Sequence, residues 1–410
     1  MKVKNVLLIG ITILTCIVSA QAQNVNIPDA NFKAALVNNA SINTNGDAEI
    51  QTNEAAAYTG AIHASQLGIT DFTGLEEFIL LDSLECSGNA VWYYDQQNGV
   101  WVLISTPLLN VSANTALTYL NCANNQLTNL DVSANIALIY LTCMLNSLTS
   151  LDVSACTALT YLSTGDDGVY MPSLTSLNVS GCSALTYLHC SGNSLTSLNV
   201  SSCTELSFLD CYGNSLSSLD VSANTALTTL ICGVNQLTSL DVSANTALTD
   251  LICWANQLTS LDVSANTALT TLDCSANQLS NLNVKNGNNM NMATFYALGN
   301  PNLSCIEVDS AAWSNINWPY IDPTASFSEN CSGAGLLDNN QSTAILSYPN
   351  PTSGMIYLSE LGNISLSDFS GKLLLEGPNT NQLDLSALPA GMYFLRIGEN
   401  NLHTYKVIKE

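Results

Sequence analysis

Residues 120–135 read LNCANNQLTNLDVSAN, and close copies of this unit recur along the middle of the chain. Successive copies start 21 residues apart, except that 15 extra residues follow the first copy and five extra residues follow the copy at Leu162. A repeat of 20–29 residues is typical of a solenoid, in which each turn of chain packs on the previous one. The nine copies begin at Leu84, Leu120, Leu141, Leu162, Leu188, Leu209, Leu230, Leu251 and Leu272.

The order of apolar and polar residues predicts the local structure of each unit. One polar residue separates Leu120 from Cys122, which is the period of a short strand with one buried side. The chain must then turn, and an asparagine side chain can bond the backbone groups left there. The second half of the unit repeats the apolar spacing, so we predict a second extended segment. The turn asparagines are Asn125, Asn146, Asn193, Asn214, Asn235, Asn256 and Asn277.

The spacing LxxLxLxxNxL, which starts at Leu117, resembles the leucine-rich repeat, with Cys122 in place of the last strand leucine. This resemblance covers about half of the chain. It implies a curved solenoid with parallel strands on its concave face, and the short repeat favours extended convex segments over helices. We expect repeats over 67–303, a small helical N-terminal cap over 23–66 and a C-terminal cap over 304–331.

The N-terminus has the features of a secretory signal peptide. Lys2 and Lys4 precede a 13-residue apolar run, Val6–Val18, which is followed by the small-residue motif Ala20-Gln21-Ala22. A membrane-spanning helix needs about 20 apolar residues, so this run is too short for an anchor. We therefore predict a signal peptide over residues 1–22. No later stretch qualifies as a membrane span.

Charge argues against two classes of partner. The chain has 32 acidic and 8 basic residues, a formal net charge of −24. Loss of Lys2 and Lys4 with the signal peptide leaves 6 − 32 = −26. Between residues 84 and 303 the chain carries a single lysine, Lys285. Because such a solenoid repels phosphate groups, we expect neither nucleic acid nor an anionic membrane as a partner.

A loop in the N-terminal cap resembles an EF-hand calcium loop. Residues 43–54 read NTNGDAEIQTNE, with asparagine at the first position and Ala48 at the position of the usual glycine. The segment is either a calcium site or a polar loop between two short helices. The calcium ligands would be Asn43, Asn45, Asp47, the backbone carbonyl of Glu49, and Glu54.

The 14 cysteines fall into separate groups. Stacked strands lie about 4.8 Å apart, whereas a disulfide needs Cβ atoms about 3.8 Å apart and zinc needs converging ligands. We therefore predict that the ladder cysteines are small buried hydrophobes. Cys305 and Cys331 bracket the C-terminal cap and predict a disulfide in an exported protein. Eight ladder cysteines share the inward strand position and three lie in the second half-repeat: Cys86, Cys122, Cys143, Cys190, Cys211, Cys232, Cys253, Cys274, Cys156, Cys182 and Cys203.

An aromatic column precedes the strand leucines and points outward. At about 4.8 Å per strand it forms a ladder on the concave face. Aromatic side chains and loops on a rigid scaffold are common in binding sites, so we predict that this surface binds a partner protein or a glycan. Alternatively, the rings only stabilise the sheet, by about 0.2–1 kcal/mol per pair. The predicted binding residues are Tyr119, Tyr140, Tyr161, Tyr187, Phe208, Tyr212 and Trp254, with Trp92, Tyr94 and Tyr170 from the two insertions.

Two other patterns lie in or beside the repeats. His189 and Cys190 are adjacent, but strand geometry places one in solvent and the other in the core, so we predict no catalytic dyad and no enzymatic activity. A column of Asp and Asn recurs on the convex segment, where it is either a solvated acidic face or a calcium ladder. Its members are Asp131, Asp152, Asn178, Asn199, Asp220, Asp241 and Asp262.

Beyond a Gly/Asn/Ser linker over 332–345, the composition changes. Residues 346–410 resemble the C-terminal sorting domain of cargo for the type IX secretion system of Bacteroidetes. The resemblance implies a small all-β sandwich-like fold, the type IX machinery as a partner, and a secreted or cell-surface location. The residues that carry it are Tyr348, Pro349, Asn350, Pro351, Gly354, Gly371, Lys372 and Gly391.

These features together predict a secreted or cell-surface protein that acts by non-catalytic recognition or adhesion. The alternative is a carbohydrate-binding accessory protein for capture of surface polysaccharide. Apart from the calcium loop, no cofactor is expected.

Overall fold

The computed structural model describes residues 23–96, 98–165, 174–331, 347–348, 352–368, 372–397 and 403–410. The chain divides into two units, Met1–Gly335 and Leu336–Glu410, which we describe separately. The predicted signal peptide and the predicted linker, residues 332–345, lie outside the described residues.

The N-terminal end of the first unit is helical, as the sequence predicts. Helix α1 spans Ala30–Val37 and α2 spans Thr52–Ala57. The Asp29 carboxylate caps α1 by accepting hydrogen bonds from the backbone N–H groups of Asn31 and Phe32. Phe32 is fully buried and packs edge-on against Phe72, with ring centroids 5.1 Å apart. The cap therefore covers the apolar end of the stack.

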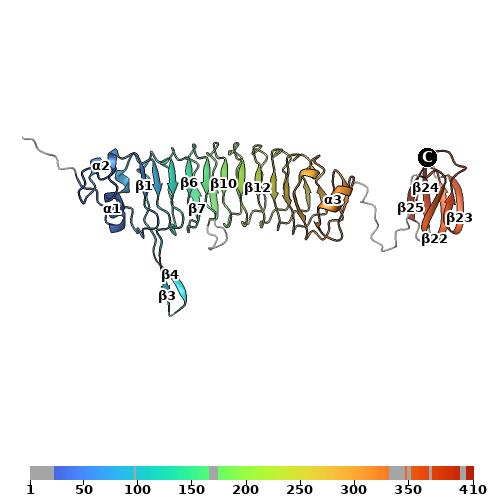
Figure 1. Ribbon diagram of the computed structural model, residues 1–410, viewed down its shortest axis with the longest axis horizontal. Coiled ribbons are helices and arrows are strands. Elements are labelled where there is room, and N and C mark those ends of the chain that lie inside the picture. Colours follow the sequence, from blue (N-terminus) through green and yellow to red (C-terminus); the bar gives the residue numbers. More distant parts are fainter. Residues whose placement is uncertain are drawn as a thin grey trace, which may run out of the picture. The chain divides into compact units, whose positions relative to one another are not determined.

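Parallel strands, mostly of three residues, stack into a 12-stranded sheet (Figure 1). Each strand pairs in register with the next, so leucine lies beside leucine through the regular repeats. The strands are β1 (Ala61–His63), β2 (Ser83–Glu85), β5 (Tyr119–Asn121), β6 (Tyr140–Thr142), β8 (Tyr161–Ser163), β10 (Tyr187–His189), β11 (Phe208–Asp210), β12 (Thr229–Ile231), β13 (Asp250–Ile252), β15 (Thr271–Asp273), β17 (Thr294–Ala297) and β19 (Tyr320–Ile321).

The second half of each unit runs extended, and two further parallel sheets form there, of four and two strands. This agrees with the predicted convex segment. Short 3₁₀ turns occur at Leu75–Glu77 (η1) and Asn289–Asn291 (η2). The strands of these sheets are β7 (Ser150–Asp152), β9 (Ser176–Asn178), β14 (Ser260–Asp262), β16 (Asn281–Asn283), β18 (Cys305–Glu307) and β20 (Ser326–Ser328).

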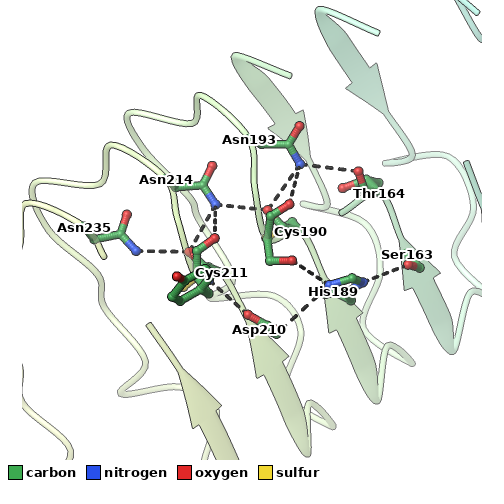
Figure 2. Close-up of polar contacts among 11 residues, drawn as sticks. Ser163, Thr164, His189, Cys190, Asn193, Asp210, Cys211, Asn214 and Asn235 are labelled. Carbon is green, nitrogen blue, oxygen red and sulfur yellow. Dashed lines mark hydrogen bonds and ion pairs between the residues drawn. The ribbon is translucent and has the colours of Figure 1, made fainter. Parts of the chain in front are cut away.

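The solenoid core contains leucines, valines and thiols. All eleven free cysteines that the structure describes are buried, as predicted for the ladder. The turn asparagines line one side of this core and bond the backbone of adjacent turns (Figure 2). Asn235, for example, donates from Nδ2 to the carbonyls of Cys211 at 3.0 Å and Cys232 at 3.2 Å, and its Oδ1 accepts from Leu216 N–H at 3.0 Å.

The first insertion forms an antiparallel hairpin that projects from the stack (Figure 1). Its strands are β3 (Val91–Asp95) and β4 (Val100–Ser105). Gly99 occupies the turn with a φ of +68°, a conformation that glycine adopts readily. In the second insertion, residues 166–173 lie outside the described part of the chain.

The C-terminal end of the stack is closed by helix α3 (Ala311–Asn317) and the last strands. Trp318 is buried and stacks on Phe295, with ring centroids 4.3 Å apart. Cys305 and Cys331 form a disulfide, which confirms that prediction.

The second unit is an antiparallel β-structure with its own core, which includes Ile356, Leu366, Leu395 and Val407. The prediction of an all-β module is thus confirmed. In the predicted sorting motif, Tyr348 lies in β21, Gly354 packs against Ser386, and Gly391 starts β24. Four other residues of the motif lie outside the described residues: Pro349, Asn350, Pro351 and Gly371. No helix of the described residues is long and apolar enough to cross a bilayer. The strands are β21 (Ser347–Tyr348), β22 (Met355–Ser367), β23 (Leu373–Asp384), β24 (Gly391–Ile397) and β25 (His403–Lys409).

Candidate recognition surface

Five aromatic side chains, here called the tyrosine ladder, lie in register on consecutive strands of the 12-stranded sheet. Their ring centroids are 4.5, 4.3, 4.4 and 4.4 Å apart, and neighbouring ring planes lie within 10° of parallel. The members are Tyr119 on β5, Tyr140 on β6, Tyr161 on β8, Tyr187 on β10 and Phe208 on β11.

This stacking decides which part of each ring a ligand can reach. The strand leucines point into the core, so the ladder residues beside them point outward and are half-buried. Each of the three inner rings has a neighbouring ring against both of its faces. The ladder therefore presents a row of ring edges, and the faces of its inner rings are covered.

Two ladder hydroxyls, those of Tyr119 and Tyr140, have raised pKa values. Burial and the neighbouring Tyr161 and Tyr119 raise the pKa of the Tyr140 phenol. Burial and the Glu85 carboxylate raise the pKa of Tyr119. Protonated phenols can both donate and accept hydrogen bonds. The ladder thus offers neutral polar groups beside apolar edges.

Three residues of the next outward column are more deeply buried than their direction predicts. Thr142, Ser163 and His189 are 5%, 2% and 9% exposed. The prediction that His189 lies in solvent is therefore wrong. Its ring fills space against Gly165, where an added Cβ would come within 2.5 Å of the imidazole. Burial here depends on neighbouring side chains, which strand alternation does not describe.

Hydrogen bonds hold the His189 imidazole in place (Figure 2). Nδ1 lies 3.0 Å from Ser163 Oγ, and Nε2 lies 2.6 Å from Ser191 Oγ. The Asp210 carboxylate lies 3.8 Å from Nε2. Cys190 points into the core, as predicted, and burial raises its thiol pKa well above the ordinary value. The adjacent histidine and cysteine therefore do not form a nucleophilic pair.

A second aromatic pair follows the ends of two strands of this sheet, β11 and β13. The rings of Tyr212 and Trp254 have centroids 5.8 Å apart and are tilted by 40°. Gly233 lies on the intervening turn, and a Cβ there would come within 3.0 Å of the indole. The missing side chain of Gly233 therefore gives Trp254 the space to lie toward Tyr212.

An open cavity of about 330 Å³ borders the ladder. Aromatic side chains and polar amides meet there, a combination that suits a ligand with both apolar and hydroxyl groups. Its lining residues include Tyr140, Tyr161, Asn121, Asn124, Thr142 and Gln66.

The insertion residues remain predictions. Trp92 and Tyr94 belong to β3, but the structure does not describe their side chains. Tyr170 lies outside the described residues.

In the calcium-like loop the predicted ligands bond one another and the nearby backbone. Glu54 Oε1 accepts from Thr44 N–H at 2.8 Å, and Glu54 Oε2 accepts from Gln51 N–H at 3.1 Å. Asn43 Nδ2 donates to the Asp47 carbonyl at 2.7 Å, and Asn45 Nδ2 donates to Asp47 Oδ2 at 3.0 Å. The Glu49 side chain pairs with Lys33 at 2.6 Å. Calcium binding by this loop stays a prediction.

The convex Asp column caps local turns. Asp131 Oδ1 accepts from Ser133 N–H at 2.9 Å, and Asp241 accepts from Ser243 in the same way. These serine hydrogen bonds lower the pKa of both carboxyls. Asn199 makes the equivalent bond to Ser201, so the turn does not require a charge.

Fold and surface together define a class: a leucine-rich-repeat β-solenoid joined to a small antiparallel β-domain. Residues 347–410 match the family described as the secretion system C-terminal sorting domain. Domains of this family target proteins for secretion and cell-surface attachment through the type IX system. The predicted sorting domain and secreted location are therefore confirmed.

Three solved structures are similar to the chain. The functional domain of InlJ from Listeria monocytogenes, which includes a cysteine ladder, is 25% identical over 94% of this chain and 98% of that chain, with a TM-score of 0.40. The Leptospira interrogans LRR protein LIC12759 is 17% identical over 68% and 80%, with a TM-score of 0.46. The internalin InlF from Listeria monocytogenes is 17% identical over 75% and 95%, with a TM-score of 0.37. No curated protein matches the chain.

Proposed function

We propose that this protein is a secreted, non-catalytic recognition protein that binds a partner protein through the tyrosine ladder. The observation that carries this proposal is the run of five stacked aromatic rings on one solvent-facing sheet. Packing the rings against one another fixes their side chains before any partner arrives. Binding then costs little further side-chain entropy, which is a general source of affinity.

The chemistry of the ladder supports a protein partner. Tyrosine is enriched among the residues that dominate interface energies because it combines apolar area with a hydroxyl. The ladder residues are half-buried, so they expose ring edges and stay anchored by their neighbours. A short rigid strand carries each ring.

Two observations support a non-catalytic role. His189 is buried, and hydroxyl groups contact both of its ring nitrogens. Burial raises the pKa of the cysteine thiols in the solenoid core, for example to about 12 at Cys143, so these thiols are poor nucleophiles. Recognition needs neither a free base nor a thiolate.

Carbohydrate binding is the second candidate, and the cavity beside Tyr140 and Tyr161 favours it. Its amide groups, from Gln66, Asn121 and Asn124, could bond sugar hydroxyls. Ring stacking by a sugar is disfavoured inside the ladder, because the inner ring faces are covered. A glycan would have to bind edge-on or in the cavity.

The test is retention on the immobilised protein, with outer-membrane and extracellular fractions in one arm and a glycan array in the other. The variant Tyr140→Ser/Tyr161→Ser/Tyr187→Ser should lose the retained protein and keep its melting temperature within a few degrees. A matched control, Tyr296→Ser/Tyr320→Ser, removes two aromatic rings at the far end of the same sheet. Unchanged retention by the ladder variant would place the binding surface elsewhere. Glycan binding without a protein partner would favour the second candidate.

A further inference from the structure

The two ends of the tyrosine ladder differ from its interior. Tyr119 and Phe208 each stack on one ladder ring, so each leaves one ring face without an aromatic neighbour in the ladder. A planar side chain of a partner could continue the stack at either end. The residues beside these two faces decide which end suits which ligand.

At the Tyr119 end the nearest carboxylate is already engaged. Ser83 of β2 lies in register beside Tyr119, and Glu85 follows on the same strand. Glu85 Oε2 lies 3.7 Å from His63 Nδ1, and the Glu85 carboxylate also raises the pKa of the Tyr119 phenol. At this end an incoming cation would have to share the carboxylate with His63.

At the Phe208 end a carboxylate remains free to bind. Thr229 of β12 lies in register beside Phe208, and Asp250 of β13 lies beside Thr229. Asp250 Oδ2 accepts from Thr249 Oγ1 at 2.7 Å. Within the described part of the chain, no side chain or N–H group donates to Oδ1 of Asp250. One small residue, Thr229, therefore separates the open face of the Phe208 ring from Asp250 Oδ1.

The spacing between Phe208 and Asp250 fits the planar guanidinium group of one arginine. Two strand steps of about 4.8 Å place the Asp250 strand about 10 Å from that of Phe208. A guanidinium stacked on Phe208 within about 6 Å of its centroid would lie above Thr229, next to the carboxylate. Arginine combines aromatic stacking with forked donation to a carboxylate, whereas the lysine ammonium is a point charge. Ile231, half-buried on β12, supplies an apolar floor for the arginine stem.

Charge favours a cationic partner on this face. The described strands of the 12-stranded sheet carry Glu85, Asp210, Asp250 and Asp273, and none of these strands contains lysine or arginine. The whole chain has a formal net charge of −24. A basic segment would be attracted to the sheet, and the Phe208 end would then select arginine.

We propose that the Phe208 ring face and the Asp250 carboxylate bind an arginine side chain of the partner, above Thr229. This inference rests on the proposed function and names the chemistry of its partner: a protein segment that bears arginine. It requires no reaction and no cofactor.

The test uses a fluorescein-labelled peptide of alternating glycine and arginine, read by anisotropy with the whole protein. Matched peptides replace arginine by lysine or by citrulline, which has the same shape without the charge. Wild-type protein should bind the arginine peptide about five-fold more tightly than the lysine peptide, and should show no binding of the citrulline peptide. Equal binding of the arginine and lysine peptides would contradict the proposal.

Two variants locate the site. Asp250→Asn removes the charge, and Thr229→Tyr adds a sixth ring that occupies the open face of Phe208. Each variant should bind the arginine peptide about tenfold more weakly than wild type does. Asp241→Asn on the convex side and Thr294→Tyr farther along the sheet are matched controls that should bind as wild type. Thermal melts verify that each variant is folded.

The outcomes also separate this inference from the proposed function. If Asp250→Asn and Thr229→Tyr bind the arginine peptide as wild type does, the arginine site is refuted. Loss of partner retention in the triple ladder variant would then still support recognition by the ladder. If the triple ladder variant retains its partner, the proposed function itself fails.

Discussion

At the residue scale, the turn asparagines stabilise the solenoid because one amide serves two turns. Asn235 is buried, donates to three backbone carbonyls and accepts from Leu216 N–H. Without this side chain, Leu216 N–H would be buried without its acceptor, which costs about 1–3 kcal/mol. The carbonyls of Cys211 and Cys232 would each keep one bond, from Asn214 and Asn256. A serine or threonine hydroxyl also donates and accepts, but it has one proton where the amide has two.

The variant Asn235→Ala should therefore lower the free energy of unfolding by about 2–3 kcal/mol, measured by urea denaturation. Its control is Asn199→Ala on the exposed convex turn, where a single bond to Ser201 N–H is lost. That control should change stability by well under half as much. Equal losses in the two variants would contradict a special role for the turn amides.

The buried thiols lead to a prediction about chemical reactivity. Burial raises the pKa of Cys156 and Cys203 to about 11 and that of Cys182 to about 12. Because the thiolate is the reactive form, native protein at pH 8 should react slowly with a thiol reagent such as DTNB. After denaturation in guanidinium, titration of the protein without its predicted signal peptide, which contains Cys16, should count eleven thiols. Fewer than eleven would mean that ladder cysteines are oxidised in pairs.

At the element scale, the C-terminal cap depends on one covalent bond. The disulfide joins Cys305 on β18 to Cys331, 26 residues later, and encloses α3 and Trp318. On the chain-entropy model, closing such a loop stabilises the fold by about 3 kcal/mol. Because the other described cysteines are thiols, a reductant acts on this bond alone within the described residues.

Reduction with dithiothreitol should therefore lower the melting temperature of the whole protein. The double variant Cys305→Ser/Cys331→Ser should melt at the lower temperature with or without reductant. A wild-type melting temperature that does not respond to reductant would show that the cap is held by packing of Trp318 and Phe295 instead.

Sequence alone predicted those elements whose cause lies within one repeat. The alternation of Leu120 and Cys122, the turn at Asn125 and the burial of the thiols follow from period and side-chain size, and the structure confirms them. The register that aligns Tyr119 with Tyr140 follows from the constant 21-residue step.

The features that sequence reasoning missed depend on contacts between repeats. His189 is buried by groups on other turns, and the inner ladder rings cover one another's faces. One missed feature did have a local signal. Asn98-Gly99 separates two β-branched and aromatic runs, which is typical of a hairpin turn and matches β3 and β4.

At the scale of the whole molecule, the proposed recognition surface and the sorting domain belong to separate units. The solenoid and the tail have separate hydrophobic cores. The solenoid core contains Leu120 and its stacked neighbours, and the core of the tail contains Leu366 and Leu395. The division of the chain agrees with this separation. The tail carries the match to the sorting family, and the tyrosine ladder lies in the solenoid.

Deletion of residues 347–410 should therefore leave the solenoid folded and abolish its export. The truncated protein should keep the melting transition of the solenoid and should accumulate inside the outer membrane of the producing bacterium. Fractionation followed by immunoblotting measures the location. As a control, a deletion of residues 91–105, the β3–β4 hairpin, should leave export unchanged. Surface display of the truncated protein would contradict this division of roles.

The claim on which the account depends is that the tyrosine ladder is the contact surface. Hydroxyl-radical footprinting, read by mass spectrometry with and without the retained partner, measures this directly. The account predicts that bound partner reduces oxidation of Tyr140, Tyr161 and Tyr187, while Tyr320, 48% exposed at the far end of the sheet, is oxidised as before. Equal oxidation of the three ladder tyrosines in the free and bound protein would contradict it.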